Sequence, residues 1–237
     1  MTGDKRLSGR IAVVTGASRG IGAAAAKRLA AEGAHVVLVA RTVGGLEEMD
    51  DAIKSVGGSA TLVPLDLREL DRVDSLGPSL YQRFGKLDIL VGNAGLLGTL
   101  GPLSHHDPKL WDQVLAVNVT ANWRLIRTLE PLLRRADAGR AIFVTSGAAH
   151  KALPFWGAYA TSKAALEAMV KSWAAELEKT NVRINLVSPG PVRTAMRAEA
   201  FPGEDPASLR PPEAIADLFV ELALPSCTRN GEVVQAY

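Results

Sequence analysis

The chain has 237 residues, a formal net charge of +2 at pH 7, 47% hydrophobic residues and one cysteine, Cys227. The hydrophobic content allows a large core and excludes a disordered chain, while the near-neutral charge excludes the basic stripe of a typical nucleic-acid-binding protein. One cysteine excludes an internal disulfide framework, and no apolar run reaches the roughly 18 residues of a membrane span. We therefore expect a soluble, cytoplasmic protein with neither a nucleic-acid nor a membrane partner.

Short apolar segments alternate with longer helical segments along the chain. The expected strands cover residues 11–15, 35–40, 60–65, 89–91, 141–145, 184–187 and 232–235. Most are continuous apolar runs, which are typical of strands buried on both faces of a parallel sheet. The expected helices cover residues 20–32, 43–56, 69–84, 107–137, 157–179 and 212–223. Strands separated in this way by helices predict one sheet with helices on both faces.

The boundaries of these elements indicate a single unit. Asp107-Pro108 is a strong helix start, because aspartate accepts hydrogen bonds at the N-cap and proline suits the next position. Residues 194–212 are rich in proline, alanine and charge, and we expect an irregular surface excursion there. We find no repeat or linker. The sequence therefore predicts one α/β domain over residues 1–237, a doubly wound fold of the Rossmann type.

A glycine-rich turn follows the first expected strand. It reads Thr15-Gly16-Ala17-Ser18-Arg19-Gly20-Ile21-Gly22 and opens the first helix. Its G-x-x-x-G-x-G spacing differs from the common G-x-G-x-x-G of dinucleotide folds. Glycines let a backbone approach a pyrophosphate, and the helix N-terminus presents free N–H groups to it. In the first turn of an alternating chain, this motif predicts a dinucleotide site.

The end of the second expected strand bears on the choice of cofactor. Enzymes selective for NAD usually place an acidic side chain there to hold the ribose hydroxyls, whereas this chain has Arg41 and no carboxylate before Glu47. Arg41 and Arg19 would instead bind a 2′-phosphate. The sequence favours NADP(H), with NAD(H) as the second cofactor; the alternative is that both arginines are solvated surface residues.

Three polar residues mark a candidate catalytic site. Ser146 ends the fifth expected strand, Tyr159 follows thirteen residues later, and Lys163 comes four residues after Tyr159. Positions i and i+4 share a helix face, so Tyr159 and Lys163 are expected to point into one site. A nearby ammonium lowers the pKa of a phenol from about 10, which would let Tyr159 act as a general acid or base. Ser146, at a strand end where ligands bind in such sheets, is expected to hold the substrate oxygen.

These motifs together resemble those of the short-chain dehydrogenases/reductases. The matching stretches are T-G-x-x-x-G-x-G at 15–22, N-A-G at 93–95, S-x12-Y-x3-K at 146–163 and P-G-P-V-x-T at 189–194. Within the family, the stretch 194–205 is most similar to bacterial 3-oxoacyl-carrier-protein reductases. The resemblance implies a seven-stranded sheet in the order 3-2-1-4-5-6-7, and an oxidoreductase that interconverts a carbonyl and a secondary alcohol, with a 3-oxoacyl compound as the candidate substrate.

The resemblance also implies residue roles that spacing alone does not. Asp66, with Leu67 beside it, corresponds to the carboxylate that contacts adenine, and Asn118 to the asparagine that completes a catalytic tetrad with Ser146, Tyr159 and Lys163. Tyr159 and Lys163 also belong to the cofactor site, where Lys163 holds the nicotinamide ribose. The remaining implied cofactor contacts are Asn93, Ala94, Gly95, Pro189, Gly190, Val192 and Thr194. From the residues alone, Asp66 and Asn118 are equally compatible with capping or buried hydrogen bonding.

Several residues support weaker interpretations. The cluster His105-His106-Asp107 is expected to cap a helix rather than bind a metal, because adjacent histidines rarely converge on one ion. His150 is expected to be a loop residue, while Trp156 is a candidate wall of the substrate pocket. The family often has Asn-Asn-Ala-Gly where this chain has Gly92 as the first residue of the motif, which removes a structural hydrogen bond but no catalytic group.

Two questions stay open at this point. A non-catalytic NADP(H)-binding sensor or scaffold of the same fold is the alternative to an enzyme, although such a protein would be free to lose Tyr159 or Lys163. A sugar-nucleotide epimerase would need a larger C-terminal domain than this sequence provides.

The helices at 107–137 and 157–179 carry Trp111, Trp123 and Trp173 and are apolar on more than one stripe. Together with the resemblance, this predicts a homodimer or homotetramer.

Overall fold

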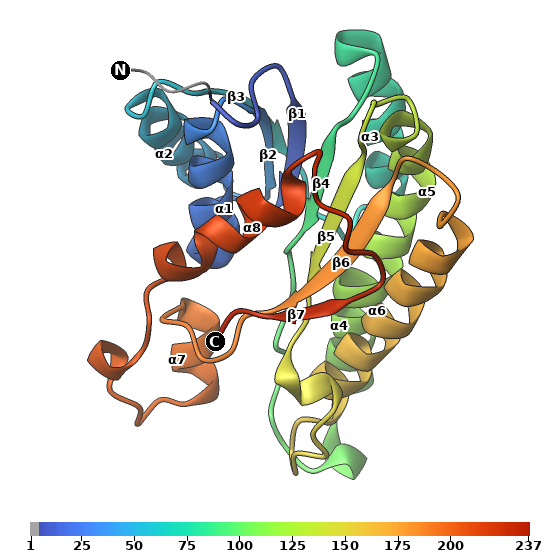
Figure 1. The fold of residues 1–237 in the computed structure, drawn as a ribbon. Coiled ribbons are helices and arrows are strands. Elements are labelled where there is room, and N and C mark those ends of the chain that lie inside the picture. Colours follow the sequence, from blue (N-terminus) through green and yellow to red (C-terminus); the bar gives the residue numbers. More distant parts are fainter. Residues whose placement is uncertain (1–4) are drawn as a thin grey trace.

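A seven-stranded parallel sheet forms the middle layer of the structure, a computed structural model that describes residues 5–237 (Figure 1). The strands are β1 (Ile11–Thr15), β2 (His35–Ala40), β3 (Ser59–Pro64), β4 (Ile89–Gly92), β5 (Arg140–Val144), β6 (Arg183–Ser188) and β7 (Val233–Gln235). Their order is β3-β2-β1-β4-β5-β6-β7, which confirms the order implied by the family resemblance. Each predicted strand lies within one residue of the observed one, because continuous apolar runs mark buried strands clearly.

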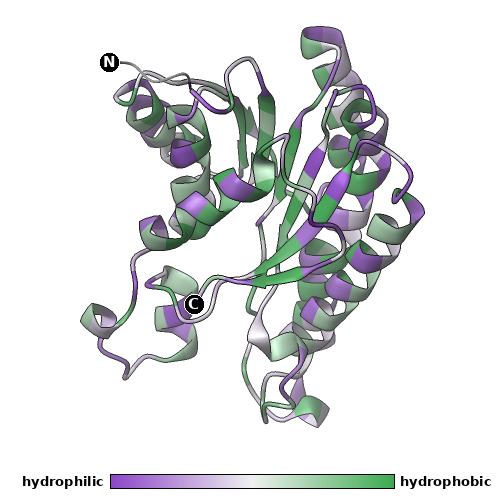
Figure 2. Ribbon diagram, viewed as in Figure 1, coloured by the Kyte–Doolittle hydropathy of each residue, from purple (hydrophilic) through white to green (hydrophobic). Residues whose placement is uncertain are grey.

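Helices cover both faces of this sheet. One face packs against α1 (Gly20–Ala31), α2 (Val43–Lys54) and α8 (Ala216–Ala223). The other packs against α3 (Leu70–Phe84), α5 (Ala121–Leu133) and α6 (Gly157–Glu176). Each face has its own apolar core, and Figure 2 shows largely hydrophobic strands between helices in which hydrophilic and hydrophobic residues are mixed. The predicted layers, with three helices on each face, are confirmed.

The long helix expected over residues 107–137 is interrupted. It begins as α4 (Pro108–Leu115), where the Asp107 carboxylate accepts a 2.7 Å hydrogen bond from the Lys109 backbone N–H. A π turn, Ala116–Thr120, follows, and α5 then continues to Leu133, four residues before the expected end. The prediction missed the π turn because it changes the side-chain register without breaking the helix.

The segment 194–212 also differs from the expected irregular excursion. It contains a short helix, α7 (Ala195–Ala200), followed by 3-10 turns. The Thr194 side chain caps α7 by accepting a hydrogen bond of 3.1 Å from the Arg197 N–H. The proline content describes the end of this segment correctly, and the threonine cap explains why a helix forms at its start.

Two further observations concern the surface. Within residues 5–237, no helix is both long and apolar enough to cross a membrane. Trp173 is buried in the core and donates a hydrogen bond of 2.8 Å to Glu130, so it is not available to a second subunit. Trp123 is exposed, with the guanidinium groups of Arg124 and Arg127 over its ring. Of these two tryptophans, only Trp123 is exposed enough to contact a second subunit. The homodimer or homotetramer stays a prediction.

Close packing of α1 against the end of β1 requires a glycine at position 22. A Cβ atom there would lie 2.3 Å from the Gly16 carbonyl oxygen and 2.4 Å from Asn93 Nδ2. Both distances are shorter than any real contact, and the Gly16 oxygen belongs to the backbone. Gly22 therefore lets the first turn of α1 lie directly on the loop that precedes it.

Gly22→Ala is expected to lower the free energy of unfolding by about 1–3 kcal/mol or more, because the added methyl group overpacks a backbone contact. Urea unfolding monitored by circular dichroism measures the change. Gly44→Ala is the matched control, since a Cβ at Gly44 in α2 meets no atom within 4 Å. That control should raise stability by up to about 1 kcal/mol. Equal stabilities for the two variants would contradict this account of the turn.

Candidate active site

A cavity of about 580 Å³ opens at the carboxyl ends of β1, β2, β4, β5 and β6. Ligands of doubly wound folds bind at this edge, near the point where the strand order reverses. Nearly all residues predicted from the sequence line it. They are Gly16, Ser18, Arg19, Gly20, Ile21, Arg41, Asp66, Leu67, Asn93, Ala94, Gly95, Ser146, Tyr159, Lys163, Pro189, Gly190, Val192 and Thr194.

Hydrogen bonds join the ends of β1 and β4 beneath the floor of this cavity. The Thr15 hydroxyl accepts from the backbone N–H groups of Asn93 and Ala94, at 3.0 and 3.1 Å, and donates to the Val91 carbonyl at 3.3 Å. The Asn93 side-chain amide donates in return to the Thr15 carbonyl at 3.0 Å. Thr15 and Asn93 therefore hold together the glycine-rich turn and the N-A-G segment.

At one end of the cavity, positive side chains surround Asp66. Arg68 forms an ion pair of 2.6 Å with the Asp66 carboxylate. This hydrogen bond from Arg68 holds the pKa of Asp66 below its ordinary value, and Arg41 adds a weaker coulombic effect. Among residues 5–237, neither Arg19 nor Arg41 pairs with a carboxylate, so both guanidinium groups remain available to a ligand. The sequence did not single out Arg68.

The structure brings the predicted catalytic residues together. Ser146 follows β5, while Tyr159 and Lys163 lie one turn apart near the start of α6. The Lys163 ammonium lies 5.7 Å from the centre of the Tyr159 ring and donates a hydrogen bond of 2.8 Å to the Val144 carbonyl. Gly95 forms the opposite wall, where a Cβ would lie 3.3 Å from Asn118 Oδ1 and 3.6 Å from Lys163 Nζ.

Asn118 lies behind the wall of the cavity, in the π turn. Its side-chain oxygen accepts a 2.8 Å hydrogen bond from the Leu96 N–H, and its amide donates to the Leu96 carbonyl and the Ser162 hydroxyl, both at 2.9 Å. The Ser162 hydroxyl donates in turn to the Tyr159 carbonyl at 2.7 Å. Asn118 is fully buried and connects the loop after β4 to the catalytic part of α6.

Burial has the largest effect on the pKa values of Tyr159 and Lys163. It raises the pKa of Tyr159, and the nearby Ser146 hydroxyl acts in the opposite direction. Burial also lowers the pKa of Lys163 to about 8, against the opposing charge of Glu167. The sequence predicts that the Lys163 ammonium lowers the pKa of Tyr159. In the folded chain, the loss of hydration on burial raises this pKa instead.

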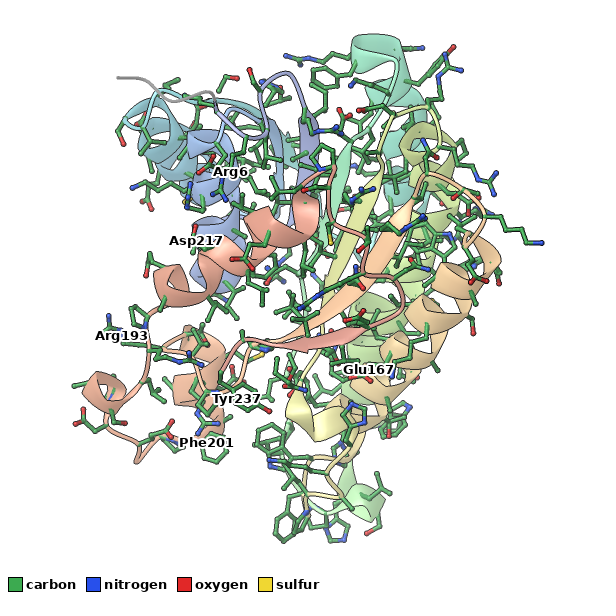
Figure 3. All side chains as sticks on the ribbon, viewed as in Figure 1. Arg6, Glu167, Arg193, Phe201, Asp217 and Tyr237 are labelled. Atoms are coloured by element: carbon green, nitrogen blue, oxygen red, sulfur yellow. The ribbon has the colours of Figure 1, made fainter. Side chains whose placement is uncertain are left out.

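The other end of the cavity is apolar and was largely missed by sequence reasoning. Leu97, Trp156 and Met196 pack around the Tyr159 ring there, and Trp156 is the candidate that the sequence did name. The Trp156 ring lies 5.6 Å from that of Phe201, which Figure 3 shows just past α7. These residues come from three separate segments of the chain, around Leu97, Trp156 and α7, so no local pattern in the sequence marks them.

Among the described residues, the ion pair at this apolar end is Arg197–Glu204, which has no net charge. The Arg197 guanidinium makes two hydrogen bonds of 2.6 Å to the Glu204 carboxylate and lies 3.7 Å from the centre of the Phe201 ring. Figure 3 shows Arg193, which also lines the cavity, on the opposite side of α7 from Phe201. The arginine that lies against the apolar end, Arg197, is therefore neutralised, whereas Arg19 and Arg41 are not.

The histidines lie outside the cavity wall. His106 Nε2 forms a hydrogen bond of 3.2 Å with the Gly101 carbonyl, and Asp107 is the N-cap already described. Within residues 5–237, no three His, Cys, Asp or Glu side chains are grouped so that they could hold a metal ion. His150 lies instead against Glu167, at 2.9 Å.

Similarity to known proteins assigns the chain to a family. The family model described as short chain dehydrogenase matches residues 10–205, and the chain belongs to this family of oxidoreductases. The uncharacterized oxidoreductase YciK of Escherichia coli is 39% identical over 219 residues, which cover 91% of this chain and 86% of that protein. It and the structures below carry no 3-oxoacyl-carrier-protein reductase name, so that narrower resemblance stays a prediction.

Solved structures agree with this assignment. A short chain dehydrogenase from Shigella flexneri, complexed with NADP, has a TM-score of 0.94 and 37% identity, covering 98% of this chain and 99% of that one. Another from Escherichia coli CFT073, complexed with NADPH, has a TM-score of 0.92 and 38% identity, covering 98% of both chains. The fold of this chain is thus that of short-chain dehydrogenases.

Thr15→Val is expected to lower the free energy of unfolding by about 2–4 kcal/mol, because the two N–H groups of Asn93 and Ala94 lose their acceptor while the shape stays the same. Chemical denaturation measures the loss. Thr42→Val is the control, since Thr42 makes no side-chain capping bond at the start of α2. If Thr15→Val proves as stable as the control, the junction between β1 and β4 does not depend on this hydroxyl.

Proposed function

We propose that the protein is an NADP(H)-dependent oxidoreductase that interconverts a carbonyl group and a secondary alcohol. The observation that carries the proposal is the convergence of Ser146, Tyr159 and Lys163 on one cavity, beside the glycine-rich turn. A hydroxyl, a phenol and an ammonium supply what such a reaction requires of a protein: a hydrogen bond to the reacting oxygen, a proton, and a positive charge beside the proton donor.

The residues of the cavity fit a bound NADP(H). A Cβ at Gly16 would lie 2.8 Å from Asn93 Nδ2 and 3.0 Å from Ala94 Cα, so the close approach of the turn to the N-A-G segment requires glycine there. The free guanidinium groups of Arg19 and Arg41 suit the 2′-phosphate. We assign the adenine to Asp66 and Leu67, and the nicotinamide end to the segments 93–95 and 189–194. When bound, the cofactor supplies or accepts the hydride.

The protein's own residues would handle the proton. The Ser146 hydroxyl holds the reacting oxygen of the substrate and orients it toward the Tyr159 phenol. During reduction the phenol gives its proton to that oxygen; during oxidation the phenolate takes one back. The buried Lys163 ammonium stabilises the phenolate, and we also assign it to the ribose hydroxyls. Asn118 keeps the loop at Leu96 and the start of α6 in register, as its hydrogen bonds indicate.

The apolar end of the cavity supports an uncharged, hydrophobic substrate. Leu97, Trp156 and Phe201 present carbon surfaces, and the Arg197–Glu204 pair has no charge to spare for an anionic group. A neighbouring cavity of about 510 Å³ shares Leu97 and continues along Leu100. An acyl chain could extend from the apolar end toward Leu100, which favours a 3-oxoacyl compound or an alkyl or aryl ketone.

Tyr159→Phe is expected to reduce turnover by a factor on the order of 10² to 10⁴, the usual effect of removing one positioned acid. Ring packing survives, so folding and NADPH affinity should change little. A panel of alkyl and aryl ketones and 3-oxoacyl thioesters, followed by NADPH absorbance, measures turnover. Ser146→Ala should also slow turnover without weakening NADPH binding, whereas Lys163→Ala should impair both.

The same panel separates the enzyme from its alternative. Near wild-type turnover in Tyr159→Phe would show that the proton comes from another group. Tight NADPH binding without turnover of any substrate would favour the sensor or scaffold interpretation.

Arg41→Asp is expected to reverse the preference for NADPH over NADH, because it removes a donor and places a negative charge beside the 2′-phosphate. A charge-assisted hydrogen bond contributes roughly 1.5–3 kcal/mol, which corresponds to about a tenfold to hundredfold preference in the wild type. Fluorescence titration with each cofactor measures the ratio. A wild type that binds both equally, or a ratio unchanged by the substitution, would assign Arg41 to the solvated surface.

A further inference from the structure

A buried carboxylate that the proposed mechanism does not use lies beside the catalytic lysine. Glu167 is on α6, one helical turn after Lys163 and two turns after Tyr159, and it is only 3% exposed. It is the group whose charge opposes the effect of burial on the pKa of Lys163. Figure 3 shows Glu167 on the side of α6 that faces the sheet.

Three side chains, from the end of β5, the following loop and α6, contact this carboxylate. The Thr145 hydroxyl, at the end of β5, lies 2.7 Å from Oε1. His150 Nε2, in the loop between Ser146 and α6, lies 2.9 Å from Oε2, and the Lys171 ammonium lies 3.2 Å from the same atom. Thr145 immediately precedes Ser146, so the carboxylate holds both ends of the segment that carries this serine.

A buried carboxylate is costly unless its charge is paired, and hydrophobic residues usually serve packing better. Glu167 is not in the cavity wall, so it cannot touch a substrate or cofactor. Two of its three contacts lead to the segment that carries Ser146: Thr145, which lines the cavity, and His150, in the loop before α6. A role in fixing the position and charge of the catalytic groups accounts for its retention.

We propose that Glu167 is a positioning residue, which holds Lys163 in its ammonium form and fixes the Thr145–His150 segment that carries Ser146. This inference rests on the proposed function, because it assumes that Lys163 binds the cofactor and supports Tyr159. No part of it requires Glu167 to exchange a proton with the substrate.

The charges around Glu167 determine how a test must be designed. On α6 itself, Lys163 and Lys171 flank the carboxylate, and Tyr159 lies beyond Lys163. From the loop it faces His150, and from β5 only the neutral Thr145 hydroxyl. The acidic group of α5 that contacts α6, Glu130, is bound to Trp173 farther along the helix. Removing the Glu167 charge therefore leaves an excess of positive charge around Lys163.

The test is NADPH affinity measured by fluorescence between pH 7 and 9.5, where the 2′-phosphate is almost fully ionised. For the wild type, affinity should fall as the pH rises through about 8, because Lys163 loses its proton there. Glu167→Gln keeps the size of the side chain and removes its charge. The midpoint should move down by about one pH unit, and affinity at pH 8 should fall by about fivefold.

Kinetics on the wild type's best substrate provides a second readout. In Glu167→Gln, kcat at pH 8 should fall by about tenfold and recover partly at pH 7, while KM for the carbonyl substrate stays within about twofold. Thr145→Val should lower kcat without moving the pH midpoint, because it removes a hydrogen bond and keeps the charge. A packing role alone would lower stability without moving this midpoint.

Matched variants complete the design. Glu176→Gln removes an exposed carboxylate from the same helix and should behave as the wild type. Lys163→Met should abolish the pH dependence of NADPH affinity. Should Glu167→Gln fail to fold by circular dichroism, Glu167→Asp keeps the charge, and it should keep the wild-type midpoint with a reduced kcat.

The outcomes separate the two proposals. If the wild type and Lys163→Met show the same pH dependence, Lys163 does not bind the cofactor and the proposed function loses that role. If the wild type titrates through Lys163 but folded Glu167→Gln keeps its midpoint, Glu167 does not set the charge of Lys163 and the inference is overturned. If Glu167→Asp, which keeps the charge, also shifts the midpoint by about one pH unit, the inference about Glu167 is likewise overturned.

Discussion

The chain leaves β1 toward one face of the sheet and β4 toward the other, and hydrogen bonds between Thr15 and Asn93 hold the two exits together. Any parallel sheet whose order reverses must part its loops at this point, which opens a crevice. The threonine hydroxyl and the asparagine amide satisfy backbone groups that the parting leaves without strand partners. The cavity, the glycine-rich turn and the position of Gly95 all follow from this junction.

Strands and their layers could be predicted from the sequence because burial on both faces leaves a direct mark, a continuous apolar run. The proximity of Tyr159 and Lys163 could also be predicted, because residues four positions apart share one face of a helix. The π turn around Asn118 could not be predicted, because it replaces one helical register by another without changing composition. The apolar end of the cavity was largely missed, because tertiary packing alone brings Leu97 to Tyr159 and Phe201 to Trp156.

The electrostatics of the site could be predicted only in part. Sequence identifies an ammonium near a phenol, but not how much water either group loses. In the folded chain Lys163 is almost completely buried, so its charge depends on the few groups that remain near it. Glu167 acts on Lys163 across one helical turn, and the Val144 carbonyl accepts a hydrogen bond from the Lys163 ammonium. The spacing of the Tyr159–Lys163 motif specifies neither interaction.

The π turn at Ala116–Thr120 has a consequence for how this region can change in evolution. A π turn holds one more residue than an α turn, so deleting one residue from it would restore a regular helix and leave the residues on either side on the faces that they now occupy. A deletion elsewhere in α4 or α5 would instead rotate the part beyond it by about 100°. The π turn is therefore the place where this segment can change its length by one residue most readily.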